Sequence, residues 1–274
     1  MKPTVAKLRL PPNPRSHPLA KTTSTFDVTA QCFDQYRALP RGVPEAIRAA
    51  IFKNAAPQQI RVLDLGAGTG RIGKAFVEAH DSYIGLDSSF AMLREFQAHS
   101  RSACLLQSDG RQLPFADRSF DVVMLMQVLS GAQDWQALLH EVRRVLRSHG
   151  VVVVGHTATP SSGVDAQMKK RLSEILREMD VAWHEPQKAR RQSLAWLESS
   201  AALHSQVTAA SWTTERTPRE FLVRHRSGAR FAALPVAVQE EALQKLSVWA
   251  KATFGPLDTA YSEEHAFELE IFEF

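Results

Sequence analysis

The stretch RVLDLGAGTG, residues 61–70, ends an apolar run with glycines at three alternate positions. The run is rich in aliphatic side chains, which is typical of a buried strand. Gly66, Gly68 and Gly70 would let the chain turn sharply and bring backbone amides close to a ligand. A helix from Arg71 would then offer its positive N-terminal end to an anion. The pattern therefore predicts a loop that binds a carboxylate or a phosphate.

The spacing of this loop separates two kinds of nucleotide ligand. A dinucleotide-binding loop reads G-x-G-x-x-G, whereas this one reads D-x-G-x-G-x-G, with Asp64 two residues before the first glycine. An acid at that place suits a ligand with an ammonium group. Asp87 ends the next apolar run, where a carboxylate can accept both ribose hydroxyls. A nucleoside ligand is therefore favoured over a dinucleotide.

Strand-like and helix-like segments alternate from residue 60 to about 157. Helices are expected near 71–80, 89–98 and 134–147, with Gly150 as the C-terminal cap of the last. This alternation predicts an α/β fold, a parallel sheet with helices on both faces. The five expected strands are 60–65, 82–87, 103–109, 120–126 and 151–157.

Polar residues follow the expected strands at their carboxyl ends. Asp109 follows the third strand and Gln127 the fourth. Ligands of open α/β sheets lie beyond these ends, so Asp64, Asp87, Asp109 and Gln127 are expected to form one site. Each residue alone could simply cap a helix or begin a turn, but their joint placement favours a binding site.

Four segments carry a resemblance to a known family: VLDLGAGTG, GLDSSFAML, SDGRQLPFADRSFDVV and EVRRVLRSHGVVVV, in that order. In these segments the chain resembles the class I S-adenosylmethionine-dependent methyltransferases. The resemblance is to the small-molecule branch, which includes biotin, ubiquinone and trans-aconitate methyltransferase-like enzymes. It implies a Rossmann-like sheet and S-adenosylmethionine as the cofactor.

The resemblance also assigns cofactor contacts. It places the glycine loop at the methionine end of the cofactor and Asp64 near its ammonium group. It further implies that Asp87 holds the ribose and that Met92 packs near the adenine. The remaining contacts on this side are Ser88, Asp109 and Gly110 beside the nucleoside and Gln127 at the fourth strand end.

The segment AQCFDQYR, residues 30–37, resembles the A-x-x-Y-D-x-x-R helix that lies over the cofactor in this family. Asp34 and Arg37 match the pattern, and Arg37 is expected to meet the cofactor carboxylate. Phe33 stands where the family has tyrosine, so a hydroxyl contact from that position is lost.

The pattern changes after Pro160 to long helical stretches. A strand-like stretch at 205–217 and another at 265–274 interrupt them, and both could rejoin the sheet. The expected organisation is a flexible arm at 1–25, a cofactor-binding core at 26–160, a mostly helical substrate cap at 161–258 and a C-terminal strand at 259–274.

The implied reaction needs little chemical catalysis from side chains. A sulfonium already makes its methyl group electrophilic, so the protein must mainly align the nucleophile. A hydroxyl or protonated amine acceptor would also need a base, for which His156 and His184 are the candidates, although either could be a structural histidine. No metal is expected, because metal-ligand spacing is missing from the sequence.

Composition places few limits on function. The net charge is +4, and arginines cluster at 187–192 and 224–230. These clusters suit solvated helix faces, an acidic substrate or RNA. A small-molecule acceptor is expected and nucleic acid is not; the alternatives are an RNA or protein methyltransferase and a non-catalytic cofactor-binding regulator.

The cellular location is expected to be the cytoplasm. The apolar runs are shorter than the roughly 18 residues of a membrane span, and the N-terminal stretch has no compact apolar region of a secretory signal. The two cysteines, Cys32 and Cys104, give no sign of an oxidising compartment. The oligomeric state stays open.

Overall fold

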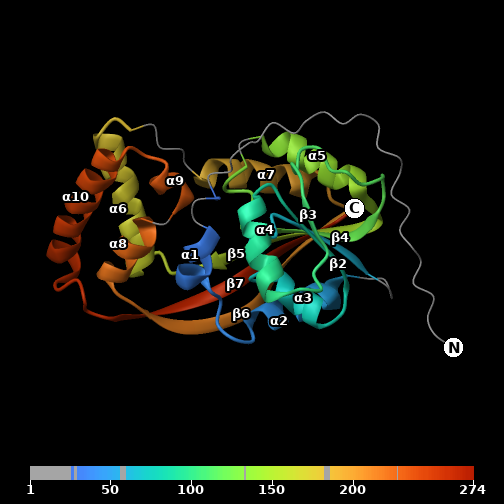
Figure 1. The fold of residues 1–274 in the computed structure, drawn as a ribbon, viewed down its shortest axis with the longest axis horizontal. Helices are drawn as coiled ribbons and strands as arrows, with labels where there is room; N and C mark the ends of the chain where they lie inside the picture. Colours follow the sequence, from blue (N-terminus) through green and yellow to red (C-terminus); the bar gives the residue numbers. More distant parts are fainter. Residues whose placement is uncertain (1–25, 28–29, 56–59, 133, 182–185, 227) are drawn as a thin grey trace.

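The computed structural model describes residues 26–27, 30–55, 60–132, 134–181, 186–226 and 228–274. These residues form a seven-stranded sheet of order β3-β2-β1-β4-β5-β7-β6 (Figure 1). Neighbours among β1 to β5 are parallel, and β7 is antiparallel to both β5 and β6. The expected Rossmann-like α/β fold is therefore confirmed. The strands are β1 (Arg61–Leu65), β2 (Ser82–Asp87), β3 (Leu105–Gln107), β4 (Phe120–Met126), β5 (Leu146–Ala158), β6 (Leu203–Arg216) and β7 (Tyr261–Glu273).

Helices cover both faces of the sheet. On one face α2 (Val43–Asn54), α3 (Gly73–Glu78) and α4 (Phe90–His99) share an apolar core with the strands. On the other face α5 (Trp135–Val145) and α7 (Pro186–Ser200) do the same. The central strand β4 is consequently buried at every position, which explains its unbroken apolar sequence.

The end of α5 differs from the sequence expectation. The helix stops at Val145, and Gly150 lies inside β5 instead of capping the helix. The N–H groups of Arg118 and Ser119 donate to the last carbonyls of α5, those of Arg144 and Val145, at 3.0 and 2.7 Å. Because these long-range bonds satisfy the helix end, no glycine cap is needed.

Residues 161–258 were expected to be a mostly helical cap from which the strand at 205–217 could rejoin the sheet. Part of this region belongs to the sheet layers and part to a cap. Helix α7 packs beside α5, where the rings of Trp196 and His140 meet edge to face at 5.5 Å. Strand β6 joins the sheet. The cap proper consists of α6 (Val164–Glu178), α8 (Pro218–Arg226), α9 (Ala229–Ala232) and α10 (Val236–Phe254). These helices bury an apolar core of their own, which includes Met168, Leu172, Ile175, Phe221, Phe231 and Leu246.

The two late strands carry the cap beyond the sheet. The pairing of β5 with β7 ends at Ala158 and Ala266, whereas β6 and β7 stay paired as far as Arg216 and Tyr261. Strand β5 is parallel to β4, so Ala158 marks the carboxyl edge of the sheet. The β6–β7 ribbon continues beyond the level of Ala158 and therefore extends past this edge. The cap helices therefore lie beyond the strand ends, with α1 (Ala30–Arg37) between them and α4 (Figure 1).

None of the helices in the described ranges is both long and apolar enough to cross a lipid bilayer.

Candidate functional site

The strand order reverses direction at β1, and ligands of open α/β sheets bind beside such a point. The chain leaves β1 toward β2 on one side and returns to β4 on the other, which makes the carboxyl ends of β1 and β4 a topological switch point. The loops that follow these two strands touch, because a Cβ on Gly66 would lie only 2.5 Å from Val128 Cγ2. The glycine loop and Gln127 therefore share one edge of the sheet.

The three loop glycines do different work, although each has a positive φ angle. A Cβ on Gly70 would lie 2.3 Å from the Phe96 ring, so this glycine lets the loop pack on α4. A Cβ on Gly68 would meet nothing within 4 Å. The open side of Gly68 is where a ligand can approach the backbone. The helix that follows, α3, begins at Gly73 and not at Arg71. The expectation that the loop amides bind the ligand is also not met at these positions, because the N–H groups of Gly66, Ala67, Gly68 and Gly70 donate to acceptors of the protein itself.

Asp87 ties the loop to the end of β2. Its Oδ2 accepts the Gly68 N–H at 2.9 Å, and its Oδ1 accepts the Ser89 N–H at 2.8 Å. Burial raises the pKa of Asp87, while these backbone N–H groups oppose the shift. Each carboxylate oxygen keeps a further lone pair, so the group can also accept ligand hydroxyls.

The helix after Asp87 brings the other predicted nucleoside contacts. Ser88 is exposed, and Ser89 caps α4 by accepting the Met92 N–H at 3.2 Å. Met92 is buried, with 2% of its surface exposed. The contact of Met92 with adenine stays a prediction.

Asp64 is buried in β1 with one oxygen satisfied. Its Oδ2 accepts the Tyr83 hydroxyl at 2.8 Å, and its Oδ1 finds no hydrogen-bond partner in the described part of the chain. Burial raises the pKa of Asp64 to about 7, while the Tyr83 hydrogen bond lowers it and the charge of Asp87 raises it further. A buried carboxylate oxygen without a donor is costly, and a ligand ammonium group would relieve that cost.

Helix α1 holds the loop from the other side. Asp34 accepts the Thr69 hydroxyl at 2.5 Å, which links α1 directly to the glycine loop. The guanidinium groups of Arg37 and Arg71 lie over the Phe33 ring, at 5.0 and 5.2 Å from its centroid. Phe33 therefore offers cation–π contacts where the family has a tyrosine hydroxyl.

Arg71 is a site residue that sequence reasoning missed. It donates to the backbone carbonyl of Arg37 and, at 3.1 Å, to Gln127 Oε1. Burial and the charge of Arg37 lower its pKa to about 10. Gln127 in turn donates to Thr157 Oγ1 at 3.0 Å, so Arg71 connects α1 with the ends of β4 and β5. Its position directly after the last loop glycine was the available signal.

Asp109 is already engaged by a neighbouring side chain. It forms an ion pair with Arg111 at 2.6 Å and accepts the Arg111 N–H at 2.8 Å. The Arg111 guanidinium holds the pKa of Asp109 below its usual value. Gly110 packs near Leu65, since its Cβ would lie 3.2 Å from Leu65 Cδ1. An adenine amine at this edge would share Asp109 with Arg111.

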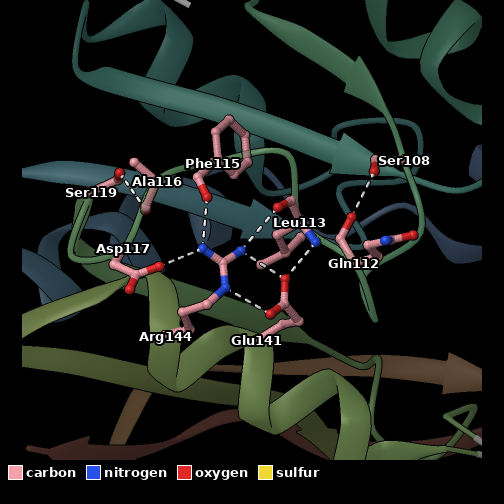
Figure 2. Close-up of polar contacts among 9 residues, drawn as sticks. All are labelled: Ser108, Gln112, Leu113, Phe115, Ala116, Asp117, Ser119, Glu141 and Arg144. Atoms are coloured by element: carbon pink, nitrogen blue, oxygen red, sulfur yellow. Dashed lines mark hydrogen bonds and ion pairs between the residues drawn. The ribbon is translucent and has the colours of Figure 1, made fainter. Parts of the chain in front are cut away.

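A network from α5 fixes the loop that leads away from Asp109 (Figure 2). Arg144 donates to the carbonyls of Leu113 and Phe115 at 2.9 and 2.7 Å and to Asp117 at 2.9 Å. Glu141 binds Arg144 through both oxygens at 2.7 Å and accepts the Leu113 N–H at 2.7 Å. This contact explains why SDGRQLPFADRSFDVV and EVRRVLRSHGVVVV belong together. The i, i+3 spacing of Glu141 and Arg144 in the helix was a sequence signal that we missed.

The two predicted catalytic histidines differ in what the structure says of them. His184 lies outside the described residues. His156 follows the buried part of β5 on the face covered by α7, and Arg190 of α7 lies 3.1 Å from its Nδ1. Burial, with the charge of Arg190, lowers the pKa of His156. Both catalytic roles stay predictions.

Across the described ranges, three or more His, Cys, Asp or Glu side chains nowhere gather in a way that could hold a metal ion.

Comparison with known proteins agrees with the expected family and fold. The methyltransferase domain family matches residues 63–154. A demethylmenaquinone methyltransferase from Mycobacterium marinum is 32% identical over 160 residues, 57% of this chain and 68% of that protein. A malonyl-acyl-carrier-protein O-methyltransferase from Methylococcus capsulatus is 32% identical over 150 residues, 51% of this chain and 54% of that protein. The second match, like those to two further demethylmenaquinone methyltransferases, spans about half of the relative's length.

Solved structures share the fold at low sequence identity. The YcgJ protein from Bacillus subtilis has a TM-score of 0.54 and 19% identity, covering 83% of this chain and 97% of its own. The cyclase SpnF has a TM-score of 0.53 and 13% identity, covering 90% and 93%. Because a cyclase shares the architecture, the fold alone does not decide the reaction.

Proposed function

This chain belongs to the S-adenosylmethionine-dependent methyltransferases, and we propose that it transfers a methyl group from that cofactor to an oxygen, nitrogen or carbon atom of a small-molecule acceptor. The observation that carries the proposal is the pairing, at the switch point, of an open glycine with a half-satisfied buried acid. Gly68 leaves space at the backbone, and Asp64 Oδ1 lies buried without a donor in the described residues. Both features fit a ligand that has an amino acid part.

The side chains around the crevice fit the rest of the cofactor. Asp64 would hold the ammonium group and Asp87 the ribose hydroxyls, while Arg37 would meet the carboxylate. When bound, the cofactor supplies a methyl group on a positively charged sulfur. The protein then has to orient the acceptor and exclude water, and positioning of this kind contributes up to about 7 to 11 kcal/mol in well-oriented reactions.

A hydroxyl acceptor would require a base near the ends of β4 and β5. His156 would be neutral near pH 7, because its pKa is lowered, and a neutral imidazole can take a proton. Arg190 lies 3.1 Å from Nδ1 and 3.5 Å from Nε2, so in this proposal the base is Nε2, the nitrogen that Arg190 contacts less closely. His184 is the second candidate for this role.

The cap is proposed to set acceptor choice, since its helices lie beyond the strand ends. The relatives are named for demethylmenaquinone and for malonyl-acyl-carrier protein, which makes small and carrier-bound acceptors the first classes to test. A reducing compartment such as the cytoplasm is proposed as well, which the exposed free thiol of Cys104 supports.

The test combines binding with turnover. Calorimetry with S-adenosylmethionine and S-adenosylhomocysteine, in the presence of a chelator, should show saturable binding of both. Cofactor carrying a labelled methyl group should then transfer the label to members of an acceptor panel. Folded protein that binds neither ligand would contradict the proposal, and binding without transfer to any acceptor would favour the regulator alternative.

A further inference from the structure

The β6–β7 ribbon carries a histidine that is enclosed but incompletely hydrogen-bonded. His265 of β7 is 4% exposed. Its ring stacks on that of Trp212, the residue with which it pairs in β6, with the ring centroids 5.8 Å apart. Its Nε2 is buried and has no hydrogen-bond partner in the described part of the chain. A buried polar atom without a partner is costly to a fold, so this nitrogen calls for an explanation in function.

A second unpartnered atom lies beside this nitrogen. Glu263 precedes His265 by two residues in β7, so both side chains lie on the same face of the ribbon. Glu263 Oε1 accepts the N–H groups of Val164 and Asp165 at 2.5 and 3.4 Å. Glu263 Oε2 is buried and, among the described residues, unpartnered. It lies 3.5 Å from His265 Nε2, but the two atoms are not aligned for a hydrogen bond.

These two side chains do not form a charged pair. Burial, together with the charge of Arg216, lowers the pKa of His265, so the imidazole is neutral near pH 7. With its proton on Nε2, the ring offers a donor next to the acceptor Oε2 of Glu263. A hydroxyl group fits this arrangement, because it can accept from Nε2–H and donate to Oε2 at the same time.

The strand register places this pair just beyond the ends of β4 and β5. Gln127 at the end of β4 donates to Thr157 of β5 at 3.0 Å, and Thr157 pairs with Phe267 of β7. His265 is two residues from Phe267 in the direction of the cap, so it lies on the same face about 7 Å further on. Phe267 belongs to the core that α2, α3 and α4 share with the strands. His265 therefore lies on the face of the sheet that these helices cover.

The same level of the ribbon has room for a ligand. An open cavity of about 610 Å³ lies where β5 ends and the ribbon continues, and its lining includes Trp212, His265 and the residues from Ala158 to Pro160. This volume is within the range of small-molecule sites. A small acceptor thus has space at the end of β5, next to the strand that carries His265.

We propose that His265 and Glu263 bind a hydroxyl group of the methyl acceptor. The inference rests on the proposed function, because it places the acceptor between the strand ends and the cap. A hydroxyl would give both buried atoms a partner, in the same way that a ligand ammonium would satisfy Asp64 Oδ1. An acceptor without a hydroxyl would leave both atoms unpaired, so the site would select against it. His265 has a binding role here, distinct from that of the base.

The binding test uses the full chain saturated with S-adenosylhomocysteine. Phenol and anisole, which carry a hydroxyl and a methoxy group on the same ring, are titrated by calorimetry into the wild type, His265→Phe, His265→Gln and Ser262→Ala. Ser262 is an exposed residue of the same strand and serves as the matched control. We expect the wild type to bind phenol about ten- to a hundredfold more tightly than anisole. His265→Phe should remove most of this preference, His265→Gln should keep part of it, and Ser262→Ala should keep all of it.

Thermal unfolding separates a binding histidine from a structural one. Phenylalanine keeps a ring beside Trp212 and removes the unpartnered nitrogen, so His265→Phe should leave the midpoint of unfolding unchanged or raise it. A midpoint lowered by more than about 5 °C would overturn the inference, because the histidine would then belong to the structural network.

The other outcomes separate this inference from the proposed function. A wild type that binds phenol no more tightly than anisole, or a preference that survives in His265→Phe, would overturn the inference. So would an equal loss of the preference in Ser262→Ala. If the wild type failed to bind S-adenosylhomocysteine at all, the proposed function would fail first. Circular dichroism of each variant confirms that it is folded.

Discussion

The glycine loop and the junction between cap and sheet satisfy their polar groups by different means. The junction is defined here as the buried acids Asp165 of α6 and Glu263 of β7 with the groups that they bind. In the loop, the N–H groups of Gly66 and Ala67 both donate to the Leu86 carbonyl, at 2.7 and 3.0 Å, and Gly68 donates to Asp87. At the junction, side-chain charges are buried instead: Asp165 is 6% and Glu263 3% exposed. The loop is thus mainly backbone geometry, and the junction is mainly a charge network.

This difference suggests a division of labour. Backbone geometry changes little with side-chain substitution, which suits a cofactor that every member of the family shares. A charge network changes with one substitution, which suits recognition of an acceptor that differs among relatives. Four predictions test this division.

The largest effect is expected at Gly70. A valine there would place its Cβ 2.3 Å from the Phe96 ring in a backbone with φ of 81°. Overpacking and backbone strain together should lower the free energy of unfolding by about 2 to 5 kcal/mol. Urea denaturation measures this loss.

Gly68→Val is the matched control for that experiment. Its Cβ meets no atom within 4 Å, so the backbone strain remains but the overpacking does not. We expect a smaller loss of stability together with a severe loss of cofactor binding. Equal destabilisation by the two valines would contradict the assignment of Gly68 to the ligand and Gly70 to packing.

Asp87→Ala should weaken S-adenosylhomocysteine binding about ten- to a hundredfold, because hydrogen bonds to a charged acceptor are worth about 1.5 to 3 kcal/mol. The structure adds that Gly68 and Ser89 would lose their acceptor, so a modest drop in stability is expected as well. An unchanged dissociation constant in calorimetry would place the ribose elsewhere.

Glu263→Ala probes the junction. The change removes the acceptor of the first N–H groups of α6 and should lower the free energy of unfolding by about 1 to 3 kcal/mol. Cofactor affinity should stay within about twofold, since the loop is untouched. A large loss of cofactor affinity would show that the junction and the loop are not separate in function.

The smallest effect concerns pH and Asp64. Its pKa in the folded chain is about 7, against 3.8 for an ordinary aspartate, so between these pH values the folded state holds a proton that the unfolded state has lost. Asp64 therefore makes stability fall as pH rises from about 4 to 7. A ligand ammonium favours the ionised carboxylate, so S-adenosylhomocysteine affinity should rise about tenfold between about pH 6 and 8. Asp64→Asn should abolish this rise in calorimetry, and a rise that persists would assign it to another group.

Local patterns in the sequence were enough to predict the strands of the sheet and the position of the glycine loop. Buried strands and amphipathic helices follow from local backbone periodicity, so β2 and β4 were predicted with the bounds that the structure shows. The glycine loop was equally local, because Gly66, Gly68 and Gly70 take positive φ angles that other residues rarely adopt.

The contacts between distant side chains could not be predicted from the sequence. Arg224 reaches Asp165 across 59 residues, and Glu263 reaches Val164 across 99. The tertiary structure also set α7 against α5 and ended α5 at Val145. Such pairings depend on the relative placement of distant elements. Periodicity within a segment carries no record of that placement, because it reports only which face of each element is buried.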